Sequence, residues 1–203
     1  MRTFFKIIGI IIIMGIASTA FYFLYWTKTP TYSLKMIEES VQTNDVETFE
    51  KYVDLDALCK KGFDDICEIR FEQNTINSFD YYFLYYDKKG LYKTKKIDSL
   101  KTRTENFIAG KTGGKTIVDS KNFSINKISI EKKADKMVLA TIEFNDSPQG
   151  KIPTVTVKMV KLNNGIWQVK EITNWEDILS TLGEDQYEIL TELPDKYEPK
   201  NTH

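Results

Sequence analysis

The sequence predicts an α+β fold, in which an N-terminal transmembrane helix is followed by helices packed on a curved, antiparallel four-stranded meander. Three observations carry this prediction. Residues 7–26 form a run of 20 positions without a charge, residues 32–110 repeat apolar side chains at helical spacing, and from residue 122 onward the spacing changes to two. Helices followed by consecutive strands are typical of α+β domains.

The apolar run of residues 7–26 has the length of a membrane span, because 20 helical residues rise roughly 30 Å, the thickness of a bilayer's hydrocarbon core. Arg2 and Lys6 precede it, so the positive-inside tendency places residues 1–6 in the cytoplasm. We therefore expect a single-pass protein of the cell membrane, with the lipid bilayer as a partner and an extracytoplasmic C-terminal domain.

A cleaved signal peptide is the alternative for this segment, and the chain would then be secreted. It would consist of a basic start, an apolar core over residues 7–16 and small residues at 17–20. The apolar run continues through residues 21–26, which favours the anchor. Both alternatives predict export.

The chain after the apolar run is long enough for one domain. We divide it into a stalk, an α+β domain and a loose tail, and we divide the domain into a helical half, a sheet half and a closing helix. The stalk is residues 27–31, the domain 32–191 and the tail 192–203. Within the domain, the helical half is residues 32–110, the sheet half 122–173 and the closing helix 174–182.

Capping residues and turns set the expected elements. Asp45 and Asp54 are suited to cap short helices that follow them, and a longer helix is expected from Lys95 to Ala109. The alternation of Phe123 and Ile125 is out of phase with that of Ile128 and Ile130, which predicts a bulge near residues 126–127. Residues 163–165, Asn-Asn-Gly, predict the last hairpin turn.

The charge balance bears on the class of partner. Of the 28 basic residues, two precede the apolar run, so 26 remain against 29 acidic residues and the net charge is −3. This balance argues against a nucleic-acid partner and against an anionic-lipid surface.

Cys59 and Cys67 are the only two cysteines, and two interpretations are open. On one continuous helix they would lie roughly 12 Å apart, beyond disulfide reach, so a bridge needs a break near Gly62. The alternative is a pair of small buried thiols. Two thiols without a nearby histidine also make a poor zinc site.

A glycine-rich stretch, IAGKTGGKTIVDS at residues 108–120, resembles a nucleotide-binding loop. Its end, Gly114-Lys115-Thr116, fits the Walker pattern, but Ala109 stands where the first glycine belongs. The expected context is also reversed, since a helix precedes the stretch instead of following it. We therefore predict no nucleotide binding, and interpret Gly110 as a helix C-cap and Gly113-Gly114 as a link toward the sheet.

Catalytic and metal-binding patterns are sparse. The only histidine is His203, the last residue, so catalysis would depend on carboxylates or tyrosines. Acidic residues cluster at Asp54 with Asp56 and again at residues 64, 65 and 68, where a solvated helix face is the ordinary interpretation. The alternating acidic loop of a calcium site is missing. We predict no catalytic residues, no metal and no cofactor.

Two segments resemble known proteins. The stretch Thr29-Pro30-Thr31-Tyr32-Ser33-Leu34, followed by residues 44–56 with the pattern D-x-x-x-F-x-x-Y-V-D, resembles the start of a bacterial family of membrane-anchored proteins of unknown function. The likeness extends from Thr29 to roughly Asp65. The stretch Gly165-Ile166-Trp167-Gln168-Val169 is similar to the final strand of nuclear-transport-factor-two-like or cystatin-like sheets. This second resemblance implies an α+β cone and carries no catalytic residues.

Aromatic residues supply the candidate binding site. Aromatic side chains such as these more often pack in the core than line a ligand pocket or a partner groove. If a binding site exists, it is expected at Tyr81, Tyr82, Tyr85, Trp167 and Trp175. The first functional hypothesis is a domain that binds a small ligand or an envelope protein without catalysis. The second is an enzyme with an inward carboxylate such as Glu143 or Asp146, and the third is a structural assembly subunit.

Overall fold

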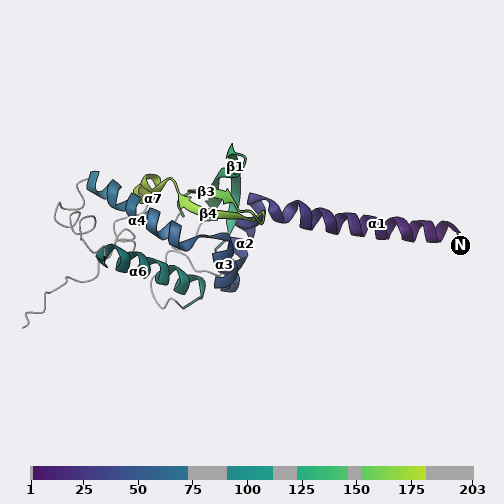
Figure 1. Cartoon of the computed structure of the whole chain (residues 1–203), viewed down its shortest axis with the longest axis horizontal. Coiled ribbons are helices and arrows are strands. Elements are labelled where there is room, and N and C mark those ends of the chain that lie inside the picture. Colours follow the sequence, from purple (N-terminus) through teal and green to yellow (C-terminus); the bar gives the residue numbers. More distant parts are fainter. Residues whose placement is uncertain (1, 73–90, 112–122, 146–151, 182–203) are drawn as a thin grey trace, which may run out of the picture.

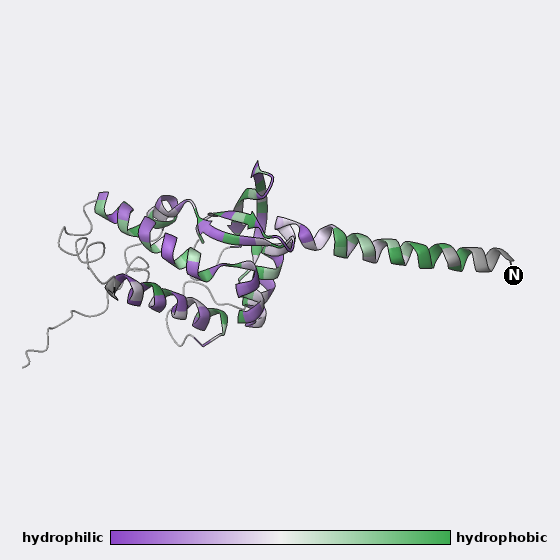
Figure 2. Cartoon of the chain, in the orientation of Figure 1, coloured by the Kyte–Doolittle hydropathy of each residue, from purple (hydrophilic) through white to green (hydrophobic). Residues whose placement is uncertain are grey.

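A computed structural model describes residues 2–72, 91–111, 123–145 and 152–181 of the chain. Helix α1, Arg2–Leu24, extends away from a mixed α+β domain, and its apolar side chains are exposed (Figures 1 and 2). By length and composition it could cross a membrane, and a signal sequence has the same properties. The predicted α+β class and the N-terminal apolar helix are confirmed.

The described domain contains five helices and the four-stranded antiparallel sheet that the sequence predicts. The helices are α2 (Pro30–Thr43), α3 (Val46–Tyr52), α4 (Leu55–Glu72), α6 (Leu91–Ile108) and α7 (Trp175–Thr181). The strands are β1 (Ile125–Ala134), β2 (Met137–Phe144), β3 (Val155–Lys161) and β4 (Trp167–Ile172). They form an open antiparallel sheet in the order β1-β2-β3-β4, which is a meander.

The helices of the first half begin where the sequence supplies a cap. The Thr29 hydroxyl accepts from the Tyr32 N–H at 3.1 Å, at the start of α2. Asp45 and Asp54 carboxylates each accept a backbone N–H at 3.0 Å, from Thr48 and Ala57 respectively, at the starts of α3 and α4. Because the first N–H groups of a helix lack partners within it, these side chains determine where each helix begins.

Strand β1 contains the predicted bulge. Its pairing with β2 shifts register between Ile125 and Lys127, as the change of phase indicated. The shift lets Phe123 and Ile125, before the bulge, and Ile128, after it, all pack against the same core. The register change therefore lets residues of odd and even number pack on one face of the sheet, although Ile130 remains exposed.

The core lies between α2 and one face of the sheet. Leu34, Ile37 and Val41 of α2 share one cluster with the alternate residues of β2, β3 and β4 that face them. Ala140 and Met159, at the centre of the sheet, have no exposed surface. Side chains thus fill the sheet face that lies under α2.

Strand β4 connects the sheet to the helices. The Asp54 N–H donates to the Val169 carbonyl at 2.9 Å, and Val53 forms an isolated bridge to the same residue. The Asp54 carboxylate also pairs with Lys170 at 2.5 Å. These contacts fix the start of α4 across β4.

Helix α4 is continuous through Gly62, and both cysteines on it are free thiols. The interpretation as two unbridged thiols is therefore confirmed, and the disulfide is not formed. Gly62 does not break the helix, and its lack of a side chain leaves room for the Trp175 ring, because a Cβ there would lie 3.0 Å from that ring. Burial raises the pKa of the Cys67 thiol to about 11.

Helix α6 ends at Ile108, and Gly110, in the first part of the glycine-rich stretch, caps it as predicted. Gly110 has φ of +66°, its N–H donates to the Phe107 carbonyl, and the Lys111 N–H donates to the Asn106 carbonyl. This pair of bonds is a Schellman C-cap. Helix α6 begins at Leu91, earlier than the expected Lys95. The remaining positions of the stretch, Gly113-Gly114 among them, lie outside the described residues.

The C-terminal ends of α2 and α6 meet. Asn44 has φ of +59° and ends α2 with the same pair of bonds, from its own N–H to Val41 and from the Asp45 N–H to Ser40. A Cβ at Gly110 would lie 2.9 Å from the Asn44 side-chain oxygen. The two residues in the left-handed conformation, Asn44 and Gly110, which end α2 and α6, therefore lie next to each other.

Replacing Gly110 by Ala should destabilise the protein by about 1–2 kcal/mol, because a Cβ is disfavoured at positive φ. The control is Asn44→Gly, which keeps the left-handed cap and should cause no loss. Denaturant unfolding measures both, and Gly110→Ala made in the Asn44→Gly background separates backbone strain from the contact. An unchanged unfolding midpoint for Gly110→Ala would contradict this account of the cap.

Candidate functional site at the junction of α1 and the domain

The apolar helix α1 passes into the domain through a short ordered turn. After Leu24 the chain forms a 3-10 helix, Trp26–Lys28, and Thr29 then caps α2. Pro30 is the first residue of α2, a position where its missing N–H costs nothing. The predicted stalk, residues 27–31, is therefore helical on both sides of Thr29.

Trp167 joins this turn to the sheet. It is the first residue of β4, its side chain is 7% exposed, and its indole N–H donates to the Lys28 carbonyl oxygen at 3.0 Å. The Lys161 ammonium lies 5.8 Å from the centre of the same indole ring, within range of a cation–π contact. One core tryptophan thus holds the end of the apolar helix against the β3–β4 hairpin.

The turn of that hairpin also contacts Lys28. Gly165 has φ of +87°, and a Cβ there would lie 2.9 Å from the Lys28 side chain. The Leu162 N–H donates to the Ile166 carbonyl at 2.8 Å and closes the hairpin. A glycine at this position therefore both makes the predicted tight turn and admits the Lys28 side chain.

Three tyrosines make a second connection. Tyr22 of α1 lies edge-on to Tyr32 of α2, with ring centres 6.3 Å apart, and Tyr32 lies edge-on to Tyr52 of α3 at 6.4 Å. The Tyr22 and Tyr52 phenols are the polar neighbours of the Tyr32 phenol. Burial, and then the hydrogen bond to Tyr22, raises the pKa of Tyr32 to about 12. We call Tyr22, Lys28, Tyr32, Tyr52 and Trp167 the junction.

The structure separates the aromatic residues that the sequence grouped as a candidate site. Trp167 opens β4, whereas Trp175 opens α7, beyond the other end of that strand. The two tryptophans therefore line no common groove. Tyr81, Tyr82 and Tyr85 lie outside the described residues.

Trp175 has a packing role at its own end of the sheet. Its ring lies against Gly62 of α4, and Ile178 and Leu179 of the same short helix are buried. Its indole nitrogen is buried and has no hydrogen-bond partner among the residues that the structure describes. This contrasts with the Trp167 nitrogen, which is bonded.

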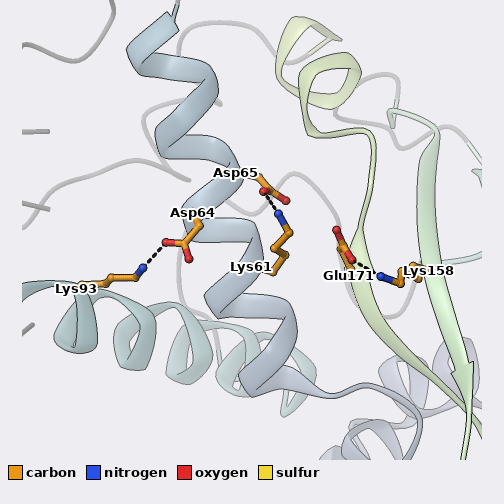
Figure 3. Close-up of polar contacts among 6 residues, drawn as sticks. All are labelled: Lys61, Asp64, Asp65, Lys93, Lys158 and Glu171. Carbon is orange, nitrogen blue, oxygen red and sulfur yellow. Dashed lines mark hydrogen bonds and ion pairs between the residues drawn. The ribbon is translucent and has the colours of Figure 1, made fainter. Parts of the chain in front are cut away.

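The acidic residues of α4 form ion pairs (Figure 3). Asp64 pairs with Lys93 of α6 at 2.5 Å, and Asp65 pairs with Lys61 of its own helix at 2.5 Å. Across from them, Lys158 of β3 pairs with Glu171 of β4 at 3.1 Å. Asp64 and Asp65 point in different directions, each toward its own lysine.

The other carboxylates considered from the sequence also have structural roles. A hydrogen bond from Lys170, aided by the bond from the Ala57 N–H, holds the pKa of Asp54 below its usual value. Glu143 is half-buried and pairs with Lys127 at 3.0 Å, and Asp146 lies outside the described residues. In the described part of the chain, no three metal-binding side chains come together.

A small polar cleft lies between β3 and α7. Its volume is about 260 Å³, and it is lined by Pro153, Thr154, Thr156, Asn174, Asp177 and Thr181. The Asn174 amide is already committed, since it accepts from the Thr156 N–H at 2.8 Å and donates to the Thr154 carbonyl at 2.9 Å. The cleft is smaller than the roughly 300–1,000 Å³ of ordinary ligand pockets, and it has no convergent free polar groups from Asn174.

Comparison with known proteins adds no family: no family model matches the chain, and neither a curated protein nor a solved structure does. The resemblances to a membrane-anchored bacterial family and to nuclear-transport-factor-two-like or cystatin-like sheets therefore stay predictions. The class that the structure defines is a mixed α+β domain directly joined to an N-terminal apolar helix.

Sequence reasoning missed most of the junction. The sequence indicates Trp167 only as a candidate pocket residue and Tyr32 only as part of a motif. Lys28 and Trp167 are 139 positions apart in the sequence, and a backbone carbonyl as acceptor leaves no residue pattern. The one available signal was the aromatic end of the apolar run, residues 21–26, followed at once by Tyr32.

Replacing Trp167 by Phe should cost about 1 kcal/mol more stability than replacing Trp175 by Phe. Both changes replace an indole with a smaller phenyl ring. Only Trp167→Phe removes a formed hydrogen bond, whereas Trp175→Phe removes a buried N–H that has no partner among the described residues. Denaturant unfolding of the two full-length variants gives the comparison. Equal losses would mean that the Lys28 bond does not stabilise the junction.

Tyr32→Phe should remove a phenol that ionises near pH 12. Because the folded pKa lies above the unfolded value of about 10, Tyr32 contributes stability below pH 10 that is lost as the pH rises toward 12. The difference between the alkaline absorbance titrations of the two proteins isolates this group. A difference curve centred near pH 10 would show that the junction does not bury the phenol.

Proposed function

We propose that this protein is a single-pass membrane protein whose α+β domain lies outside the cytoplasm and binds an envelope protein without catalysis. Helix α1 would be the anchor, and the alternative is a signal segment removed on secretion. Support for the anchor comes from its end, where Phe21 and Tyr25 stack at 5.5 Å beside Trp26, since aromatic rings favour the headgroup region.

The observation that carries the proposal is the junction. Trp167 and Lys28 are bonded, and Tyr22 contacts Tyr32, so the domain begins directly at the end of the apolar helix. A cut at the small residues 17–20 would keep Tyr22, but it would remove most of the helix that presents Tyr22 to Tyr32. An anchored domain so attached can reach only partners close to the bilayer.

A protein partner is favoured over a small ligand because the sheet face under the helices is filled. Ala140 and Met159 have no exposed surface, and α2 covers them. A ligand at this face would have to displace core side chains. A contact with a protein uses the outer surface and requires no such displacement.

The enzyme hypothesis has less support among the described residues. Asp54, Asp64, Asp65 and Glu143 are engaged in ion pairs, and Asp54 also caps a helix. A structural assembly subunit also binds a protein partner, and differs from a binding domain only in how long the complex lasts. The same experiment therefore addresses both non-catalytic hypotheses.

Site-specific photo-cross-linking in native membranes tests the proposal. Ile130 on β1 and Phe71 near the end of α4 are exposed apolar side chains, 39% and 40% accessible. In Figure 1, β1 lies near α1, whereas the end of α4 lies far from it. A cross-linker at Ile130 should give one discrete protein adduct, and the matched position Phe71 should give none.

Topology is measured in the same cells. A cysteine at Asn164, an exposed turn residue, should react with a membrane-impermeant thiol reagent from outside intact cells, in a background with Cys59→Ser and Cys67→Ala. The protein should also resist alkaline extraction at its full length. Labelling only after lysis, release of a shortened chain, or absence of any protein adduct would each contradict the proposal.

A further inference from the structure

Three lysines lie together at the end of the sheet that adjoins α1. The Lys161 N–H donates to the Lys136 carbonyl at 2.9 Å, which places the β1–β2 turn beside the end of β3. Both Lys161 and Lys28 contact Trp167. The Lys161 ammonium lies over the Trp167 ring, and the Lys28 carbonyl oxygen accepts from the Trp167 indole N–H. We call Lys28, Lys136 and Lys161 the basic cluster.

The basic cluster differs from its neighbours in charge pairing. Lys132 pairs with Asp135 at 2.9 Å, and Lys133 pairs with Glu131, so the rest of the β1–β2 hairpin is locally neutral. Among the described residues, no carboxylate forms an ion pair with any of the three cluster lysines. Lys28 and Lys136 are exposed and Lys161 is half-buried, so their charges are accessible from outside.

The position of the cluster is set by the fold. Met137 pairs with Val160, so the β1–β2 and β3–β4 turns lie at the same end of the sheet. Figure 1 shows this end beside the exit of α1, with α4 and α6 extending the other way. If α1 crosses the bilayer, its last residues lie at the headgroups, and Lys28 follows Leu24 by one short turn.

We propose that the basic cluster binds the anionic phospholipid headgroups of the leaflet from which α1 emerges, and so orients the domain on the membrane. This inference rests on the proposed membrane anchoring. The net charge of −3 predicted no affinity for such a surface, but that sum ignores where the charges lie. The three lysines of the basic cluster, which pair with no carboxylate among the described residues, create a local positive field although the domain as a whole is acidic.

The expected strength follows from lipid electrostatics. Each lysine near an anionic surface contributes about 1 kcal/mol, and the attraction falls off over a Debye length of about 8–10 Å at physiological salt. Because α1 already holds the domain at the surface, the cluster has only to select an orientation. Lysines on α4 and α6, farther from the bilayer, gain little.

Lysine footprinting of the full chain in nanodiscs tests the inference. Acylation rates at Lys136 and Lys161 should fall roughly five-fold when phosphatidylglycerol replaces part of the phosphatidylcholine, and this protection should disappear in high salt. Exposed Lys60 on α4 and Lys95 on α6 serve as internal controls and should change little.

A pair of variants adds a cooperative readout. In Lys136→Gln/Lys161→Gln, the remaining Lys28 should lose its lipid-dependent protection, whereas the matched variant Lys60→Gln/Lys95→Gln should keep it. Equal labelling of the cluster in both lipids, in a chain that resists alkaline extraction, would overturn the inference and leave anchoring intact. A chain that does not remain in the bilayer would instead overturn the proposed function.

Discussion

The hydrogen bond from the Trp167 indole to the Lys28 carbonyl is the contact on which the arrangement of this molecule depends. It joins the end of the apolar helix to the first residue of β4, and β4 in turn pairs with Val53 and Asp54 before α4. The same strand lies under α2. One strand therefore positions α1, α2 and α4 relative to one another.

This arrangement assigns different tasks to the two faces of the junction. Toward the domain, Trp167 and Tyr52 are buried, 7% and 4% exposed, and belong to the core. Toward the apolar helix, Tyr22 and Lys28 are exposed and meet the solvent or, in the proposed setting, the headgroups. The orientation of the domain is thus linked to the stability of its core, so weakening the core near Trp167 would also loosen the domain from its anchor.

Local features were predictable from the sequence, and long-range ones were not. The caps at Asp45, Asp54 and Gly110 and the bulge in β1 depend on neighbouring residues, so residue type and spacing revealed them. The separation of Trp167 from Trp175, and the contact of Trp167 with Lys28, depend on how distant segments pack, for which one sequence carries no pattern. A net charge contains no positions, so composition alone could not indicate the basic cluster.

The Trp167–Lys28 bond and the Tyr22–Tyr32 contact should make α1 and the domain move as one body, and a distance between spin labels measures this directly. Labels at Ser18 on α1 and Glu176 on α7 occupy exposed positions, in a background with Cys59→Ser and Cys67→Ala. In full-length protein reconstituted into bilayers, pulsed electron paramagnetic resonance should give one narrow distance distribution, which Trp167→Phe should broaden. A broad distribution in the unsubstituted junction would mean that the domain swings freely on its helix, and would contradict this account.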